Sequence, residues 1–365
     1  MIRLLVILVC GVPLFLRAQV PLPVITSEDR FFIFHDGRFE QMEPRPPKKA
    51  LAMNGQFVYQ DQQGQLKIFL PEGRRLHLLD RRSDIVLKGT RKRVAWMAMD
   101  TLKTVREGRA VILAENVQRF TVGDSIMVLL DSARHEMIAL WKRTATTLAT
   151  VQPGSESAQW AQGSNTVVFF NKEAGSLFAY YHGSVKLLCD STDVGIVATG
   201  GDIVGYWHGG KRNFRAYYKG ADVELADLRP ARVLAGEGLL AFVDANGRLK
   251  CFESGVLHTV LDEAPTDFWV KDSLLLFLHD GRLNLFQHGS ATVVEPYVPE
   301  QWQVEGGLLA YLDINRELRG IVNGERFRFG KEANINGFEL YGDAVIYRSP
   351  LGPMVVATKR RTYEY

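Results

Sequence analysis

The sequence has few cysteines and lacks the linear motifs that mark common catalytic and cofactor sites. Its 365 residues include three cysteines, Cys10, Cys189 and Cys251, and neither these nor the eight histidines have the spacing of metal ligands. There is no Gly-x-Ser-x-Gly elbow, no His-Glu-x-x-His pair and no phosphate-binding loop. Cys189 and Cys251 could form a disulfide in an oxidising compartment, but both lie in strand-like runs, which favours two buried thiols. The sequence therefore predicts no metal, no cofactor and no catalytic residue.

Long hydrophobic spans are also missing, apart from one run at the N-terminus. Residues 4–16 form an apolar segment after Arg3, which is typical of a secretory signal peptide and is short for a membrane span. We predict a signal peptide over residues 1–18 and a mature domain over residues 19–365. Lipidation at Cys10 is the alternative. The predicted protein is exported, periplasmic or associated with the cell surface, and has no transmembrane span.

The chain has little excess charge of either sign, with a formal net charge of +3. Residues 1–120 carry 20 lysines and arginines against 12 acidic residues, whereas the remainder carries 24 against 29. A basic first third suits an anionic polymer or lipid surface, although chance scatter explains it equally simply. Nucleic acid is not predicted as a partner.

What the sequence does contain is a repeat of short apolar runs that end in an anchor residue, usually aromatic. The spacing from one anchor to the next is 25 residues for the first pair and 33 to 40 thereafter, close to 36 on average, as in repeat architectures. The anchors are Phe34, Tyr59, Trp96, Leu129, Phe169, Tyr206, Phe242, Phe277, Tyr311 and Tyr347.

Each repeat reads as a four-stranded antiparallel meander. An apolar residue stands nine positions before each of the last eight anchors, and a pair of turn residues such as Gly201-Asp202 separates the two in seven of these units. A second turn and a third strand follow the anchor, and a short fourth run closes several units. The eight residues are Leu87, Phe120, Trp160, Val197, Val233, Phe268, Trp302 and Phe338.

The anchor runs also indicate how the sheets pack. Runs such as Leu240-Ala241-Phe242 are apolar without alternation, so both faces of that strand must be buried. Small sheets stacked around an axis bury both faces, whereas a sandwich exposes one face of each sheet. The chain therefore resembles the repeat β-propellers, which implies an all-β fold of roughly 7–10 blades. The first unit, broken by Pro44, Pro46 and Pro47, is expected to be an incomplete blade, and two joined propellers are an alternative arrangement.

Two clusters are candidate binding residues. Arg74, Arg75, Arg81 and Arg82 belong to a basic stretch that continues to Arg93 and could hold an anionic surface. Solvated strand and turn residues are the simpler interpretation.

The second candidate is a turn that combines aromatic, imidazole and cationic groups with two glycines, which suits the rim of a ligand site. Its candidate residues are Trp207, His208, Lys211 and Arg212. A repeat turn with a chance tryptophan is the simpler interpretation.

These features favour a non-catalytic binding or scaffold protein of the bacterial cell envelope, which contacts another envelope protein through its propeller loops. An anionic polymer or lipid surface is a further possible partner. The alternative is a propeller-fold enzyme acting on polysaccharide, a lyase or hydrolase, whose charged groups converge from several blades without a linear motif.

Overall fold

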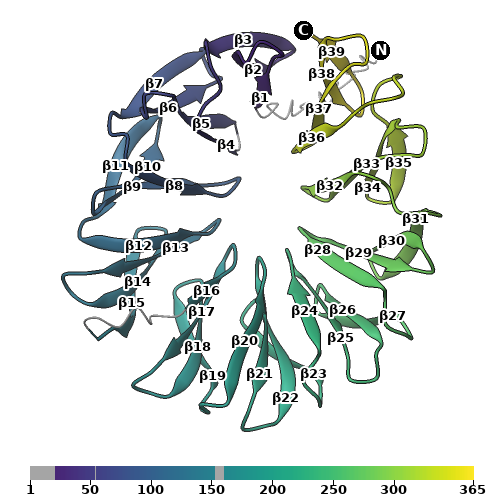
Figure 1. Cartoon of the computed structure of the whole chain (residues 1–365). Helices are drawn as coiled ribbons and strands as arrows, with labels where there is room; N and C mark the ends of the chain where they lie inside the picture. The colour runs from purple at the N-terminus through teal and green to yellow at the C-terminus, as the bar shows by residue number, and fades with distance from the viewer. Residues whose placement is uncertain (1–20, 54, 153–159) are drawn as a thin grey trace, which may run out of the picture.

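The chain folds into ten small β-sheets arranged around a central axis (Figure 1). The computed structural model describes residues 21–53, 55–152 and 160–365, so the predicted signal peptide at residues 1–18 lies outside the described residues. All regular elements in the described part of the chain are β-strands. In that part, no helix is present that could cross a membrane. The predicted all-β propeller is confirmed, with the blade number at the upper end of the expected range.

The first blade has three strands, and blades 2 to 4 have four each. Blade 1 contains β1 (Leu22–Ile25), β2 (Phe31–His35) and β3 (Arg38–Glu43); blade 2 contains β4 (Lys49–Met53), β5 (Gln56–Gln60), β6 (Leu66–Leu70) and β7 (Arg75–Asp80); blade 3 contains β8 (Ile85–Gly89), β9 (Val94–Ala98), β10 (Thr101–Arg106) and β11 (Arg109–Ala114); blade 4 contains β12 (Val117–Val122), β13 (Ile126–Asp131), β14 (Glu136–Trp141) and β15 (Thr144–Thr150).

Blades 5 to 7 repeat the four-stranded meander. Blade 5 contains β16 (Trp160–Gln162), β17 (Thr166–Asn171), β18 (Ser176–Tyr181) and β19 (Ser184–Cys189); blade 6 contains β20 (Val194–Thr199), β21 (Ile203–His208), β22 (Asn213–Tyr218) and β23 (Ala221–Ala226); blade 7 contains β24 (Arg232–Ala235), β25 (Leu239–Val243), β26 (Leu249–Glu253) and β27 (Val256–Leu261).

Blades 8 to 10 complete the ring with the same strand order. Blade 8 contains β28 (Asp267–Lys271), β29 (Leu274–His279), β30 (Arg282–Gln287) and β31 (Ser290–Glu295); blade 9 contains β32 (Trp302–Glu305), β33 (Leu308–Leu312), β34 (Leu318–Val322) and β35 (Glu325–Arg328); blade 10 contains β36 (Phe338–Tyr341), β37 (Ala344–Arg348), β38 (Met354–Thr358) and β39 (Thr362–Glu364).

Every anchor residue lies in the second strand of its blade and is at most 3% exposed. The residue nine positions earlier lies on the first strand and pairs directly with the anchor across the hairpin, as Phe120 does with Leu129. This pairing holds in seven of the eight units, whereas in blade 6 a β-bulge between Ile196 and Ala198 shifts the register. The nine-residue spacing in the sequence thus separates two residues that pair across one hairpin.

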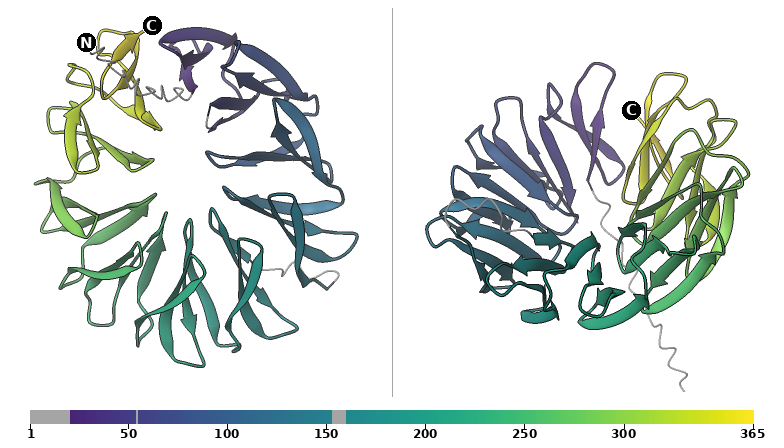
Figure 2. Two further views of the ribbon diagram at one scale, coloured as in Figure 1. Left: turned by 180° about the vertical axis from the view of Figure 1, so that it is seen from behind. Right: turned by 60° about the horizontal axis from the view of Figure 1, so that its bottom comes forward.

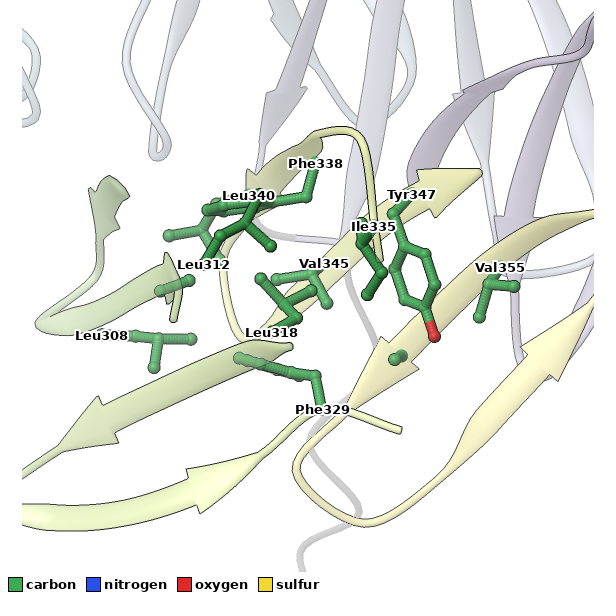
Figure 3. Close-up of a cluster of buried hydrophobic side chains, with 12 residues drawn as sticks. Leu308, Leu312, Leu318, Phe329, Ile335, Phe338, Leu340, Val345, Tyr347 and Val355 are labelled. Atoms are coloured by element: carbon green, nitrogen blue, oxygen red, sulfur yellow. The ribbon is translucent and has the colours of Figure 1, made fainter. Parts of the chain in front are cut away.

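The second strands are buried on both faces because each blade packs against two neighbours. The first strand of each blade lies nearest the centre of the ring and the later strands lie outward (Figure 1). Figure 3 shows one such interface, in which Leu308 and Leu318 of blade 9 pack with Val345 and Tyr347 of blade 10. The apolar anchor runs therefore supply core to two interfaces at once.

Blades 1 and 10 close the ring by side-chain packing. The two terminal blades lie side by side in both views (Figures 1 and 2). Phe32 and Phe34 of β2 share a buried cluster with Ala344 and Ile346 of β37. In the described part of the chain each blade is built from one continuous segment, so no strand is exchanged between the two ends.

A buried polar contact joins blades 2 and 3. Asp80, at the end of β7, accepts hydrogen bonds from the indole Nε1 of Trp96 at 3.0 Å and from Lys103 Nζ at 2.8 Å. Although burial opposes ionisation, these donors and the backbone N–H of Arg82 hold the pKa of Asp80 below its ordinary value. The Asp80 carboxylate therefore fixes the polar end of an otherwise apolar anchor.

The same arrangement recurs at other interfaces. In each case the last strand of one blade supplies an acidic residue to the anchor of the next blade. Tyr59 donates its hydroxyl to Glu43 at 3.0 Å, and Tyr311 donates to Glu295 at 2.9 Å. Lys67 Nζ also contacts Glu43, at 2.6 Å, as Lys103 contacts Asp80. The acidic residue lies 16 positions before the anchor in all three examples.

The meander gives the ring two distinct ends. In the four-stranded blades, the turn side carries the turns from first to second strand and from third to fourth strand. The linker side carries the turns from second to third strand and the linkers between blades. Because successive antiparallel strands reverse direction, these assignments follow from the strand order alone.

Candidate functional site

The structure separates the four predicted arginines into two pairs. Arg74 and Arg75 lie at the start of β7 on the turn side, and both are exposed. Arg81 and Arg82 follow the end of β7 on the linker side, where Arg82 donates to the carbonyl of Ala98 at 3.5 Å. The remaining five residues of β7 separate the two pairs and prevent them from forming one patch. Binding by these residues stays a prediction, now for two separate surfaces.

Arg74 and Arg75 belong to a wider group of cations on the turn side of blades 2 to 4. We call this group the cationic arc; it consists of Arg74, Arg75, Arg106, Arg109, Lys142 and Arg143. All six lie at or beside the turns from third to fourth strand of three successive blades, and all are exposed. Those turns carry only two acidic residues, Glu72 and Glu107, and no ion pair forms with an arc cation among the described residues. Six cations against two acidic residues leave the arc with a net positive charge.

The second predicted cluster lies on the linker side of blade 6. Trp207 is half-buried, His208 is buried, and Lys211 and Arg212 are exposed in the turn between β21 and β22. The turn packs closely on the preceding linker, because a side chain at Gly209 would overlap the carbonyl oxygen of Asp193. Only the two cations of this turn are therefore freely accessible.

The sequence did not reveal that Cys189 and Asp190 lie beside His208. One ligand atom of each of the three lies within 4.8 Å of the others, and Cys189 Sγ is 3.4 Å from His208 Nδ1. These residues could hold a metal ion by their chemistry. However, His208 Nδ1 already accepts the backbone N–H of Lys211 at 3.2 Å. Burial, with the charges of Lys211 and Arg215, lowers the pKa of His208 and favours the neutral imidazole, which is the form that binds metals. The same two positive charges would oppose a bound cation by electrostatic repulsion.

The centre of the ring narrows on the turn side to a cavity of about 300 Å³, lined by six consecutive blades from blade 3 to blade 8. The turns of neighbouring blades touch backbone to backbone there. Gly201 N–H donates to the carbonyl of Gly236 at 2.9 Å, and Glu237 N–H donates to that of Asp272 at 2.7 Å. A side chain at Gly200 would overlap the carbonyl oxygen of Gly236, so this close approach requires glycine.

Arg91 spans the ring at this narrow end. It extends from the first turn of blade 3 to blades 8 and 9, on the opposite side, and contacts Asp272 at 3.2 Å and Glu305 at 3.1 Å. Beside it, Lys92 Nζ contacts Asp124 of blade 4 at 3.0 Å. Burial raises the pKa of Glu305, and Arg91 opposes that rise. These five charged groups are therefore paired with one another. Glu237, which also lines the cavity, forms no ion pair among the described residues, and burial raises its pKa.

Most residues of the cationic arc, and the contact of Arg91 across the ring, were not predicted from the sequence. Arg106, Arg109, Lys142 and Arg143 are far from Arg74 in the chain and share only their position in the repeat. The available signal was a pair of cations in the same turn of three successive units. The sequence does show that Arg91 and Lys92 occupy a turn where other units have small or acidic residues. It does not show the partners of Arg91, because these lie 181 and 214 positions later in the chain.

Comparison with known proteins places the chain in a family. A family model described as a 10-bladed beta propeller domain matches residues 15–363. No curated protein matches the chain.

Similarity to solved structures is low. They include PorZ, a bacterial surface component of the type-IX secretion system of Porphyromonas gingivalis, at 10% identity and a TM-score of 0.31, covering 95% of this chain and 59% of PorZ. Apo AztD from Citrobacter koseri has 11% identity and a TM-score of 0.34, covering 73% of this chain and 91% of AztD. BamB from Moraxella catarrhalis has 12% identity and a TM-score of 0.32, covering 75% of this chain and 96% of BamB. Identities this low carry no information on activity.

Proposed function

The chain belongs to the family of ten-bladed β-propeller domains, and on that premise we propose that it is a non-catalytic binding or scaffold protein of the bacterial cell envelope. Its partner is another envelope protein with an acidic surface. The contact is made by the cationic arc on the turn side of blades 2 to 4. Export of the protein is part of the proposal and rests on the apolar segment at residues 4–16 after Arg3.

The net positive charge of the arc is the observation that carries this proposal. Six exposed cations stand on three neighbouring turns with two acidic residues among them. Such a rim attracts an acidic partner over several ångströms and fixes its orientation, since complementary charge raises the association rate and selects the partner. Exposed lysines and arginines that merely solvate a surface are usually interspersed with acidic residues.

The ion pairs that hold the acidic groups of the channel mouth, apart from Glu237, favour a binding role over catalysis. A catalytic funnel needs acidic or basic groups free to exchange protons with a substrate. Here Asp272 and Glu305 are both held by Arg91, and Asp124 is held by Lys92. The side chains of Asp272 and Glu305 are 29% and 26% exposed, so a substrate would have to displace Arg91 to reach them.

A pair of variants matched in number and type of residue tests the proposal. R74Q/R75Q removes two arc arginines, whereas R81Q/R82Q removes two arginines of the linker side. Immobilised wild-type protein and both variants are incubated with solubilised envelope of the native host, and bound proteins are quantified by mass spectrometry. We expect R74Q/R75Q to lower capture of the partner about three- to tenfold, because exposed charge pairs contribute about 0.2 to 1 kcal/mol each. R81Q/R82Q should capture as well as wild type.

Salt provides a second readout. Capture by wild type should fall as the salt concentration rises above about 0.15 M, and it should fall less steeply for R74Q/R75Q. Equal loss in both variants, or capture that salt does not change, would contradict the proposed contact. Hydrolysis or cleavage of a polysaccharide by the purified protein would instead support the enzyme alternative.

A further inference from the structure

A cavity of about 500 Å³ opens on the turn side, inside the cationic arc, and is lined mainly by blades 3 and 4, with Met53 and Gln56 of blade 2. It differs from the channel mouth, which is lined by the turns of blades 3 to 8 around the ring axis. Its volume falls within the range of roughly 300 to 1,000 Å³ that is usual for small-molecule sites.

The floor of this cavity is apolar. Val94 of β9 and Met127 of β13 are 2% and 4% exposed and belong to the cores on either side of blade 3. Leu113 and Leu140 line the walls and are half-buried. The cavity is therefore the place where the packing between blades 3 and 4 stops short of the turn side. It offers apolar surface to a ligand without any rearrangement of the core.

The rim of the cavity is cationic. Lys92, Arg93, Arg106, Lys142 and Arg143 all line it, and the lining contains no acidic residue. Asp124, which lies outside the lining, contacts Lys92 Nζ at 3.0 Å. The remaining four cations have no ion-pair partner among the described residues.

Arg93 is the most informative of these cations, because its side chain is half-buried. Burial lowers the pKa of its guanidinium, and the charge of Asp124 offsets part of that effect. Within the described part of the chain, the Arg93 guanidinium has no hydrogen-bond acceptor, although its backbone N–H donates to Thr90. An anion in the cavity would supply the acceptor that the described residues do not provide, in a charge-assisted hydrogen bond.

We propose that this cavity is a binding site for a small amphiphilic anion, in which an apolar tail fills the space over Val94 and Met127 and a phosphate, sulfate or carboxylate group contacts Arg93, Arg106 and Arg143. Such a ligand contacts both the apolar residues and the cations of the lining. A neutral lipid would contact only the apolar residues, and an inorganic anion only the cations. The inference goes beyond the proposed scaffold role, since it requires no protein partner.

Calorimetric titration of the full-length mature protein with hexyl phosphate tests the site. Hexanol, inorganic phosphate and hexylammonium serve as comparison ligands. We expect hexyl phosphate to bind one equivalent per chain at least tenfold more tightly than inorganic phosphate, with no measurable binding of hexanol or hexylammonium. Vesicles containing phosphatidic acid show whether the anion can also be presented by a membrane. Binding to vesicles and to free hexyl phosphate identifies a lipid source, and binding to hexyl phosphate alone identifies a soluble one.

Three variants assign the binding to the cavity. R93Q should weaken hexyl phosphate binding at least tenfold, and Ala145→Phe, at an exposed position of the lining, should abolish it by filling the space. R109Q removes an arc cation that does not line the cavity and should bind as wild type. The inference is overturned if hexyl phosphate binds no more tightly than inorganic phosphate, or if R93Q and Ala145→Phe bind it normally while unfolding cooperatively. Because R109Q affects only the arc, loss of partner capture and loss of ligand binding can be told apart.

Discussion

Replacing Asp80 by asparagine removes the charge from the buried contact between blades 2 and 3 while keeping its shape. The Asp80 side chain is 7% exposed and that of Lys103 is 19% exposed, so both groups are largely out of water. An asparagine oxygen can still accept from Trp96 Nε1, but Lys103 Nζ would lose its counter-ion at 2.8 Å. The amide nitrogen would then replace the oxygen that accepts the backbone N–H of Arg82 at 3.2 Å. The variant therefore removes the ion pair and this backbone contact while it keeps the hydrogen bond of the anchor.

The expected cost follows from the burial of the two groups. Removing one partner of a buried ion pair usually costs about 3 to 5 kcal/mol, since the remaining charge is left uncompensated. Lys103 retains some exposure, so we expect about 2 to 3 kcal/mol for D80N. Replacing Lys103 by methionine as well removes the uncompensated charge. The D80N/K103M double variant should therefore be within about 1 kcal/mol of wild type.

Urea denaturation at several pH values measures both the cost and its origin. Contacts with Lys103 and Trp96 lower the folded-state pKa of Asp80 below the unfolded value of about 3.9. The stabilisation is then fully present above that unfolded pKa and is lost as the pH falls through the folded one. The difference between wild type and D80N should be constant from about pH 5 to 8 and should shrink below about pH 4.

A surface ion pair provides the control. Arg30 and Glu28 are 2.7 Å apart, but their side chains are 51% and 66% exposed. R30Q should change the free energy of unfolding by less than about 1 kcal/mol. The reasoning fails if D80N costs no more than R30Q, if the costs of D80N and K103M simply add, or if the D80N difference persists unchanged in acid.

Three further predictions concern the ring and its export. R91Q should lower the free energy of unfolding by about 1 to 2 kcal/mol, because Asp272 and Glu305 lose a shared, partly exposed cation; unchanged urea midpoints would contradict this. Gly200→Ala should cost about 1 to 3 kcal/mol in thermal unfolding, since its Cβ would overlap the Gly236 carbonyl, whereas Gly195→Ala, which meets only the flexible Arg229 side chain, should cost less. N-terminal sequencing of natively produced protein should begin near Gln19, and recovery from the cytoplasm with Met1 intact would refute export.

The blades could be predicted from the sequence because their determinants are local. An anchor such as Phe242 and its partner Val233 lie on one hairpin, so their pairing fixes a constant spacing in the chain. The run at residues 240–242 is buried on both faces, as its lack of alternation indicated. The first unit was recognisably short, and it has three strands instead of four.

The site could not be predicted in the same way because its contacts cross the ring. Arg91 reaches Asp272 only because ten blades bring blade 3 opposite blade 8, and one blade more or fewer would change that partner. The number of blades was the quantity that the repeat left open. The separation of Arg74 and Arg75 from Arg81 and Arg82 has a simpler cause, since β7 starts at Arg75 and runs to the other end of the ring at Asp80. Basic residues that are neighbours in the chain thus lie at opposite ends of the ring.

The turn side therefore combines two kinds of charge that serve different purposes. At the axis, backbone contacts between glycines leave no room for side chains. Arg91 forms ion pairs with the facing blades 8 and 9, and Lys92 forms one with the adjacent blade 4. Farther out, the turns from third to fourth strand face water and touch no opposite blade, so their cations have nothing within the ring to pair with. A repeat constrains spacing in the core far more than charge in these outer turns. Binding residues of this chain are thus best sought at equivalent outer positions of successive blades, where Arg74, Arg106 and Lys142 stand.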